Sequence, residues 1–89
     1  MYKIKKAQPF IIEGQNGKKY LIPAFNSLSA DDVSEIMGLT LDTPAEKRIG
    51  TLKRFLLRFA PELENEGLGD VGYSQIFAAY EKEQNLGER

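Results

Sequence analysis

Two short apolar runs on either side of an Asn-Gly pair dominate the first third of the chain. Residues Phe10–Ile12 and Tyr20–Ile22 flank Asn16-Gly17. Asn-Gly is the preferred pair of a type I′ turn, because both central residues of that turn need a positive φ. The pattern therefore predicts a β-hairpin over residues 8–25, in which Pro23 ends the second strand because proline cannot donate to a strand ladder.

The turn leaves the register of the two strands open. A two-residue loop at Asn16-Gly17 would create two apolar cross-strand pairs, Ile11 with Ile22 and Ile12 with Leu21. A four-residue loop over residues 14–17 would instead place Glu13 opposite Lys18. In either register both faces carry apolar groups, and a lone two-stranded sheet is marginally stable in water. We therefore expect one face to pack on helices, and the other to expose one of the two apolar pairs.

Apolar residues at helical spacing follow the hairpin in three segments, and they predict helices over residues 30–37, 44–59 and 73–84. Ser29 is a suitable N-cap for the first helix, and Gly38 is expected to end it in a left-handed conformation with Leu39 folding back as an apolar contact. The inward face of this helix is expected to consist of Leu28, Val33, Ile36 and Met37.

The helix over 44–59 carries the clearest signals. Thr43 as N-cap, Pro44 at the first position and Glu46 at the third form a capping box. Its apolar stripe is expected to lie in the core and consists of Ile49, Leu52, Phe55, Leu56 and Phe59. Leu57 falls away from this stripe, so it is a candidate contact residue. Pro61 ends the helix and begins a short turn over Pro61–Glu66 that Gly67 closes.

The last helix, 73–84, has one apolar face made of Tyr73, Ile76, Phe77 and Tyr80. The exposed edge of Tyr73 or Tyr80 is a further candidate contact. Together the elements predict an α+β fold over one domain, residues 1–89, in which an N-terminal β-hairpin packs on a small three-helix core and most residues are helical.

Composition removes most catalytic chemistry. The chain has 89 residues with no cysteine and no histidine, so it lacks thiol nucleophiles, Cys/His zinc sites and the commonest general base. Its carboxylates read as helix-start charges at Asp31 and Asp32 and as an exposed acidic stretch, with no EF-hand spacing. We therefore expect no enzyme, no metal site and no cofactor.

The charges are segregated although the net charge is only −1. The hairpin end is basic and includes Lys3, Lys5, Lys6, Lys18 and Lys19. The acidic stretch includes Glu62, Glu64, Glu66 and Asp70. Most such runs are solvated faces, but these two could also meet between copies of the chain, which would suit self-association.

A helix-turn-helix is the rival interpretation, because "VSEIMGLTLDTPAEKRIG" places a short helix, Gly38 and a second helix in sequence. That motif joins its helices by about 3–4 residues, fewer than here. Glu46 at the front of the second helix would repel phosphate, although Lys47, Arg48, Arg54 and Arg58 point the other way. The overall acidity makes nucleic acid an unlikely partner in this interpretation.

From residue 8 to residue 84 the chain resembles the tail assembly chaperones of long-tailed bacteriophages and prophages of Gram-positive bacteria. The segments that carry the resemblance are "GQNGKKYLIPA", "FLLRFAPEL" and "LGDVGYSQIFAAYEKEQ". None of them is a catalytic signature, and the resemblance assigns no functional residue position by position. A neighbouring tail or neck gene product is the alternative within the same gene cluster.

The resemblance implies a non-enzymatic role in virion morphogenesis. Such chaperones keep the long tape measure protein soluble while tail tube subunits polymerise around it, and a ribosomal frameshift often appends a second domain that recruits the tube protein. The end of this chain at "NLGER" is expected for the unextended form. The partners implied are the tape measure protein, the tail tube protein and further copies of the chain.

The candidate partner-binding residues are Ile11, Ile12, Leu21, Ile22, Leu57, Tyr73 and Tyr80. No apolar run approaches the roughly 18 residues that a membrane span needs, and no signal-peptide core follows the basic N-terminus. We therefore expect a protein of the bacterial host cytoplasm with no membrane partner.

Overall fold

A computed structural model describes residues 1–3, 8–39 and 42–84, and it confirms the predicted fold class, a two-stranded hairpin followed by three α-helices. The elements in chain order are β1 (Phe10–Glu13), β2 (Lys19–Ile22), the 3₁₀ turn η1 (Phe25–Ser27), α1 (Ala30–Met37), α2 (Ala45–Phe59), the 3₁₀ turn η2 (Pro61–Glu66) and α3 (Asp70–Glu83). Lys5 and Lys6 of the expected basic end lie outside the described residues.

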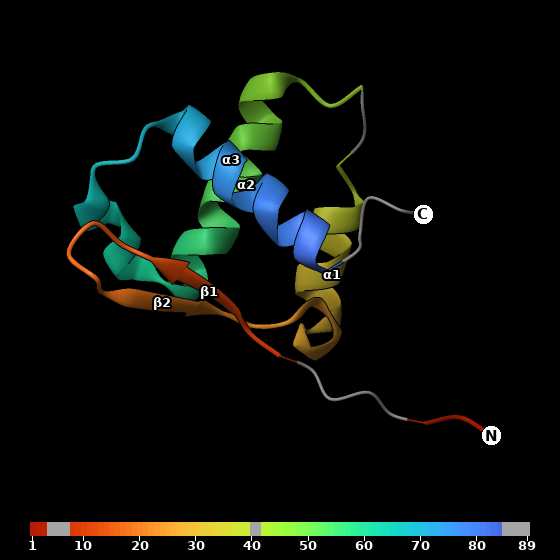
Figure 1. Cartoon of the computed structure of the whole chain (residues 1–89). Coiled ribbons are helices and arrows are strands. Elements are labelled where there is room, and N and C mark those ends of the chain that lie inside the picture. Colours follow the sequence, from red (N-terminus) through yellow and green to blue (C-terminus); the bar gives the residue numbers. More distant parts are fainter. Residues whose placement is uncertain (4–7, 40–41, 85–89) are drawn as a thin grey trace.

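The helices α2 and α3 lie against each other and form the centre of the molecule (Figure 1). The hairpin packs on one side of this pair, with β1 against α3 and β2 against α2, while α1 packs on α2. The η2 turn follows α2 and lies beside the hairpin tip, at the left of the view (Figure 1). The sheet therefore has helices on one face only, as expected for a small antiparallel hairpin.

Aromatic rings fill the space between the hairpin and the two long helices. Phe55 is fully buried, and its ring centroid lies 5.8 Å from those of Phe77 and Tyr80. Phe10 of the hairpin meets Tyr80 edge-on at 5.5 Å, which ties β1 to α3. Such edge-to-face pairs contribute about 0.5–1.5 kcal/mol beyond their buried area. Of the expected stripe on α2, Leu52, Phe55 and Leu56 are buried, whereas Ile49 and Phe59 are half-buried.

The first helix begins where the sequence predicts and ends differently. Ser29 caps it, because its Oγ accepts a hydrogen bond from the backbone N–H of Asp32 at 3.2 Å. Gly38 has φ −75°, so the predicted left-handed end is wrong. The backbone N–H of Gly38 still bonds the carbonyl of Ser34, and the right-handed turn therefore continues through it. Met37 was expected on the inward face but is 46% exposed.

The starts of α2 and α3 also differ from the prediction. Pro44 holds the N-cap position of α2, since the N–H of Arg48 bonds its carbonyl, and the helix therefore begins at Ala45. The predicted capping box needs Thr43 at the N-cap, so its position is wrong by one residue. The third helix begins at Asp70, three residues before the predicted start. The apolar spacing did not reveal residues 70–72, because their only apolar side chain is the exposed Val71. Aromatic spacing alone does not mark such a turn.

Candidate contact surface

The hairpin adopts a register that neither expected loop gives. Gly17 has φ 79° and closes a three-residue loop, with its N–H bonded to the Gly14 carbonyl at 3.1 Å and the Gly14 N–H bonded to the Lys18 carbonyl at 2.6 Å. This is the pattern of a turn followed by a left-handed glycine bulge. The strands then pair Phe10 with Ile22, Ile11 with Leu21, Ile12 with Tyr20 and Glu13 with Lys19. Asn-Gly marks the hairpin correctly, but it suits this loop as well as the type I′ turn.

The shift of register exchanges the side chains between the two faces, because alternate residues of a strand point to opposite sides. Ile11 and Leu21 face outward as direct cross-strand partners and are 55% and 56% exposed. Ile22 is fully buried, and Ile12 is half-buried against the core. Both expected outward pairs are therefore wrong, and the exposed pair combines one residue from each. We call Ile11 and Leu21 the outer hairpin pair.

The remaining candidates from the helices lie in or against the core. Tyr73 and Tyr80 are 1% and 0% exposed, so the expected exposed aromatic edge of the last helix is wrong. Tyr80 can be buried whole because its hydroxyl donates to the Pro23 carbonyl at 2.9 Å. The loss of water around this ring raises the pKa of Tyr80 to about 12. Leu57 is half-buried and packs against the core, not away from it.

Glu66 fastens the hairpin tip to the η2 turn. Its carboxylate accepts hydrogen bonds from the Gln15 backbone N–H at 3.0 Å and from the Tyr20 hydroxyl at 2.7 Å. The Gln15 side-chain amide returns a bond to the Glu66 carbonyl at 3.1 Å. The pKa of Glu66 is lowered below its usual value, chiefly by the hydrogen bond from the Gln15 N–H. The hydrogen bond from the Tyr20 hydroxyl and the positive charge of Lys18 lower it further.

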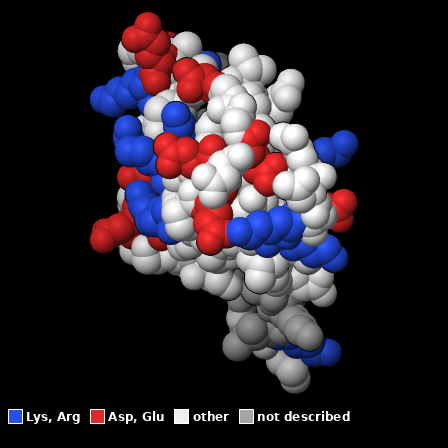
Figure 2. All heavy atoms as spheres, turned by 90° about the vertical axis from the view of Figure 1, so that its left-hand side faces the viewer, with Lys and Arg blue, Asp and Glu red and all other residues white. Residues whose placement is uncertain are grey.

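A second link at the same end is the ion pair between Lys18 and Glu62. A meeting of the basic hairpin end and the acidic stretch between copies was one of two interpretations, and in the structure Lys18, Glu62 and Glu66 meet within one chain. Figure 2 shows this end of the molecule, where acidic and basic side chains are intermixed and do not form two separate patches. The hairpin tip is consequently held in place, and with it the two strands that carry the outer hairpin pair.

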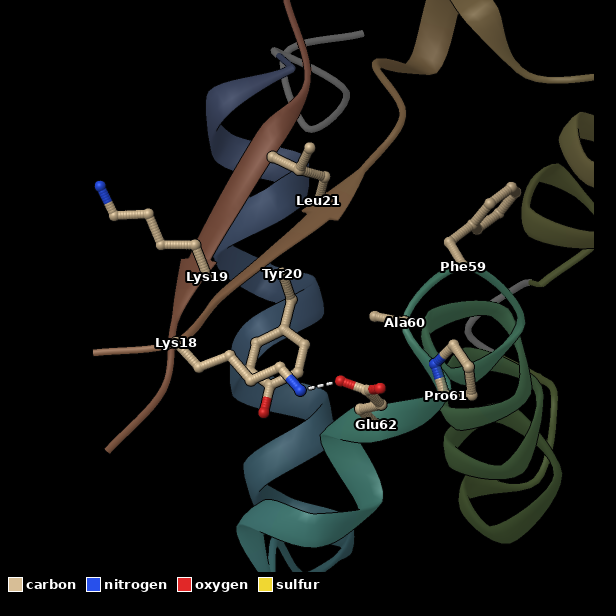
Figure 3. A pocket seen from close by; sticks show the side chains of 8 residues that line it. All are labelled: Lys18, Lys19, Tyr20, Leu21, Phe59, Ala60, Pro61 and Glu62. Atoms are coloured by element: carbon tan, nitrogen blue, oxygen red, sulfur yellow. Dashed lines mark hydrogen bonds and ion pairs between the residues drawn. The ribbon is translucent and has the colours of Figure 1, made fainter. Parts of the chain in front are cut away.

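A hollow of about 340 Å³ lies beside β2, between this strand and the junction of α2 with η2. We call it the β2 hollow; its lining residues are Lys18, Lys19, Tyr20, Leu21, Phe59, Ala60, Pro61 and Glu62. Figure 3 shows Leu21 on the strand side and Phe59, Ala60 and Pro61 on the helix side, with the Lys18–Glu62 ion pair spanning the gap between hairpin and η2 and Lys19 pointing away. The outer hairpin pair thus continues into an apolar hollow through Leu21.

The sequence contains Phe59 and Pro61 in recognisable roles, as the end of an apolar stripe and as a helix stop. Nothing in the pattern places them beside Leu21, since 38 positions of chain separate Leu21 from Phe59 in the printed numbering. Only the packing of β2 on α2 brings them together. Periodicity cannot detect such a surface, because each wall reads as an ordinary core or boundary residue.

The described parts of the chain contain neither a candidate metal site nor a candidate membrane span. Within residues 1–3, 8–39 and 42–84 there is no group of three or more acidic, cysteine or histidine side chains arranged to hold a metal ion. Over the same residues, no helix has both the length and the apolar character to cross a membrane. Comparison with protein-family models, with curated proteins and with solved structures finds no match to this chain.

Proposed function

We propose that this chain is a non-enzymatic tail assembly chaperone of a long-tailed phage or prophage, acting in the bacterial cytoplasm. It would bind the tape measure protein and keep it soluble while the tail tube assembles, and would also contact the tail tube protein and further copies of itself. The proposal comes from the resemblance of residues 8–84 to that family. Another small phage morphogenesis protein is the alternative of the same kind.

The observation that best supports a binding role is the outer hairpin pair. Ile11 and Leu21 are apolar, adjacent and more than half exposed, on the two strands of a hairpin whose tip is fastened by Glu66. A contiguous exposed apolar patch is typical of a protein-binding surface. A chaperone for a long apolar partner needs an exposed apolar surface, and the β2 hollow extends the surface beyond the strand.

A DNA-binding role is less well supported. Residues 38–44 separate α1 from α2, a connection longer than the about 3–4 residues of a helix-turn-helix. Arg58, one of the basic residues that favoured this role, is engaged in ion pairs with Asp32 and Glu35 of α1. A gel shift at low and at high salt separates the two functions, because phosphate contacts weaken steeply as salt rises.

The proposal is tested by co-expressing the chain with the tape measure protein encoded in the same gene cluster. We expect the wild-type chain to move the tape measure protein into the soluble fraction, and the double variant Ile11→Asp with Leu21→Asp to lose this effect. Two carboxylates in place of the outer hairpin pair would prevent apolar contact without touching the core.

The matched control is Val71→Asp, which introduces the same change at another exposed apolar residue, 68% exposed, outside the outer hairpin pair. This control should keep the tape measure protein soluble. Light scattering on the purified chain checks self-association in parallel. A strictly monomeric chain together with an insoluble tape measure protein would contradict the proposed function.

A further inference from the structure

The outward edge of β2 offers free backbone hydrogen-bonding groups. Because the Gly14 N–H bonds the Lys18 carbonyl, the alternation of an antiparallel ladder makes Ile12–Tyr20 and Phe10–Ile22 the hydrogen-bonded pairs. Lys19 and Leu21 belong to the other pairs, so their N–H and carbonyl groups point away from β1. Pro23 follows at the next outward position and has no N–H, which limits the open edge to these two residues.

The wall opposite this edge is largely apolar, and its η2 end is closed by Glu62 in its ion pair with Lys18. Phe59, Ala60 and Pro61 border the β2 hollow on the helix side, and Leu21 borders it on the strand side (Figure 3). The hollow measures about 340 Å³, within the range of about 300–1,000 Å³ that ligand clefts occupy. A free strand edge facing an apolar helical wall is the setting in which proteins bind an extended peptide as an additional strand.

The wall also limits what can pair with β2. Strands in a sheet lie about 4.8 Å apart, so a new strand beside β2 would occupy the β2 hollow, which Phe59, Ala60 and Pro61 border on its other side. A second folded copy would bring its own helices on the same face of the sheet, because its hairpin also covers helices on one face only. Those helices would compete with α2 and η2 for the space under the new strand pair. A single extended segment without a helical layer of its own avoids this competition.

We propose that the β2 edge binds an extended segment of a partner protein, antiparallel to Lys19–Leu21, with the pattern apolar, apolar, acidic. The residue opposite Leu21 would extend the outer hairpin pair, and the next would enter the β2 hollow. The third would place a carboxylate beside Lys19, which is exposed and forms no ion pair with any residue that the structure describes. The antiparallel direction follows from its more stable pairing.

The hairpin itself contains this pattern on the other side of β2. Ile11, Ile12 and Glu13 of β1 lie opposite Leu21, Tyr20 and Lys19, respectively. β2 therefore already pairs with a strand of this pattern in the antiparallel direction, although no ion pair joins Glu13 and Lys19 among the described contacts. The incoming segment would repeat that arrangement at the open edge, with Phe59 and Pro61 in place of the core beneath its middle residue.

This inference states how the proposed contact surface takes its partner, and it rests on the proposed function only for the partner's identity. The probe is therefore a synthetic fluorescein-labelled heptapeptide with Ile-Val-Glu at its centre and Gly and Ser around it, measured by fluorescence anisotropy with the full chain. We expect saturable binding. Methylation of the isoleucine nitrogen should abolish it, because that N–H would donate to the Leu21 carbonyl.

On the protein side, Leu21→Pro removes an outward N–H and should weaken binding about fivefold or more, the value of one lost hydrogen bond. Glu13→Pro is the matched control, since it makes the same backbone change at the β1 edge, at an exposed residue outside the outer hairpin pair, and should bind the peptide as the wild type does. Proline is tolerated at an edge where the N–H faces solvent.

The charge prediction is independent of these proline variants. Lys19→Glu should weaken binding of the Ile-Val-Glu peptide and strengthen binding of an Ile-Val-Lys peptide, each by about two- to fivefold, as expected for a cross-strand ion pair. Equal binding of the methylated peptide, or equal affinities of Leu21→Pro and Glu13→Pro, would overturn the proposal. Self-association that Leu21→Pro abolishes, without peptide binding, would assign the edge to a second copy and also overturn it.

The peptide measurement and the co-expression experiment can fail separately. A chain that binds the peptide but leaves the tape measure protein insoluble keeps the strand-edge site and loses the phage function. A chain that solubilises the tape measure protein but ignores the peptide keeps the function and loses the strand-edge site.

Discussion

The position of the Glu66 carboxylate depends on the absence of a side chain at Gly14. A Cβ at Gly14 would lie 2.5 Å from Oε2 of Glu66 and 3.1 Å from Cε2 of Tyr20. The carboxylate can approach the Gln15 N–H only because this space is empty. The φ of Gly14 is not among the left-handed values, so its role is close approach and not backbone conformation.

Gly14→Ala should therefore destabilise the fold by displacing the Glu66 carboxylate from its two donors. We expect the melting temperature to fall by roughly 4–8 °C, a shift typical of one local change in a domain of this size. In a Glu66→Ala background the same substitution should cost clearly less, because the displaced group is already gone. Circular dichroism melts of the four proteins check this, and strict additivity would show that Gly14 acts through another contact.

The lowered pKa of Glu66 predicts a loss of stability in acid. A carboxyl whose folded-state pKa lies below its unfolded value contributes stability that is complete above the unfolded pKa, about 4.3 for glutamate. This contribution disappears as the pH falls through the folded-state pKa. Urea midpoints between pH 7 and pH 3 should fall more for the wild type than for Glu66→Gln. Parallel curves for the two proteins would remove Glu66 as the cause.

At the scale of elements, Arg58 of α2 attaches the short helix α1 through two ion pairs. Arg58 pairs with Asp32, which is buried, and reaches Glu35 at 3.2 Å. Asp32 also accepts a hydrogen bond from the Ser29 hydroxyl at 3.1 Å. The N-cap of α1 and its attachment to α2 therefore share one carboxylate, so a change at Arg58 reaches the start of the other helix.

Arg58→Ala should destabilise the protein by about 1–2 kcal/mol, because it leaves the buried carboxylate of Asp32 without its charged partner. The matched control is Arg54→Ala on the same helix. Arg54 is exposed and bonds only the Thr51 hydroxyl of its own helix among the described contacts, so its loss should remain within about 0.5 kcal/mol. Urea unfolding measures both values, and equal costs would assign the effect to helix propensity.

For the whole molecule, the packing of the hairpin, α2 and α3 centres on Phe55. This ring contacts Phe59 of its own helix and Phe77 and Tyr80 of α3, while Tyr80 contacts Phe10 of the hairpin. A two-stranded hairpin is at best marginally stable alone in water. The hairpin and its contact surface consequently exist only while this aromatic cluster is intact.

Phe55→Ala should cost about 3–5 kcal/mol, a large part of the roughly 5–15 kcal/mol that such a domain has. We expect the hairpin and the helices to unfold in one transition at a much lower temperature. Near-ultraviolet circular dichroism follows the aromatic packing, and far-ultraviolet circular dichroism follows the helices. Val71→Ala, at an exposed position of α3, should leave both unchanged. Separate transitions of hairpin and helices in Phe55→Ala would contradict a shared core.

Much of the fold could be predicted from local physics. The consecutive apolar runs around Asn16-Gly17 indicate the hairpin, Ser29 marks the start of α1, and Pro61 and Gly67 bound the turn between α2 and α3. These signals act over a few residues, through a backbone conformation or a hydrogen bond that a neighbouring side chain supplies. They succeed because no distant residue is needed to produce them.

The contact surface could not be read in the same way. Whether Leu21 faces the core or the solvent depends on a one-residue choice of register, and the printed chain allows three. The register in the structure buries Phe10, Tyr20 and Ile22 against the helices and lets Tyr20 reach Glu66. Burial of three large side chains and a long-range hydrogen bond are properties of the packed molecule. The local sequence therefore specified a hairpin, and the packing of that hairpin on α2 and α3 selected its outward face.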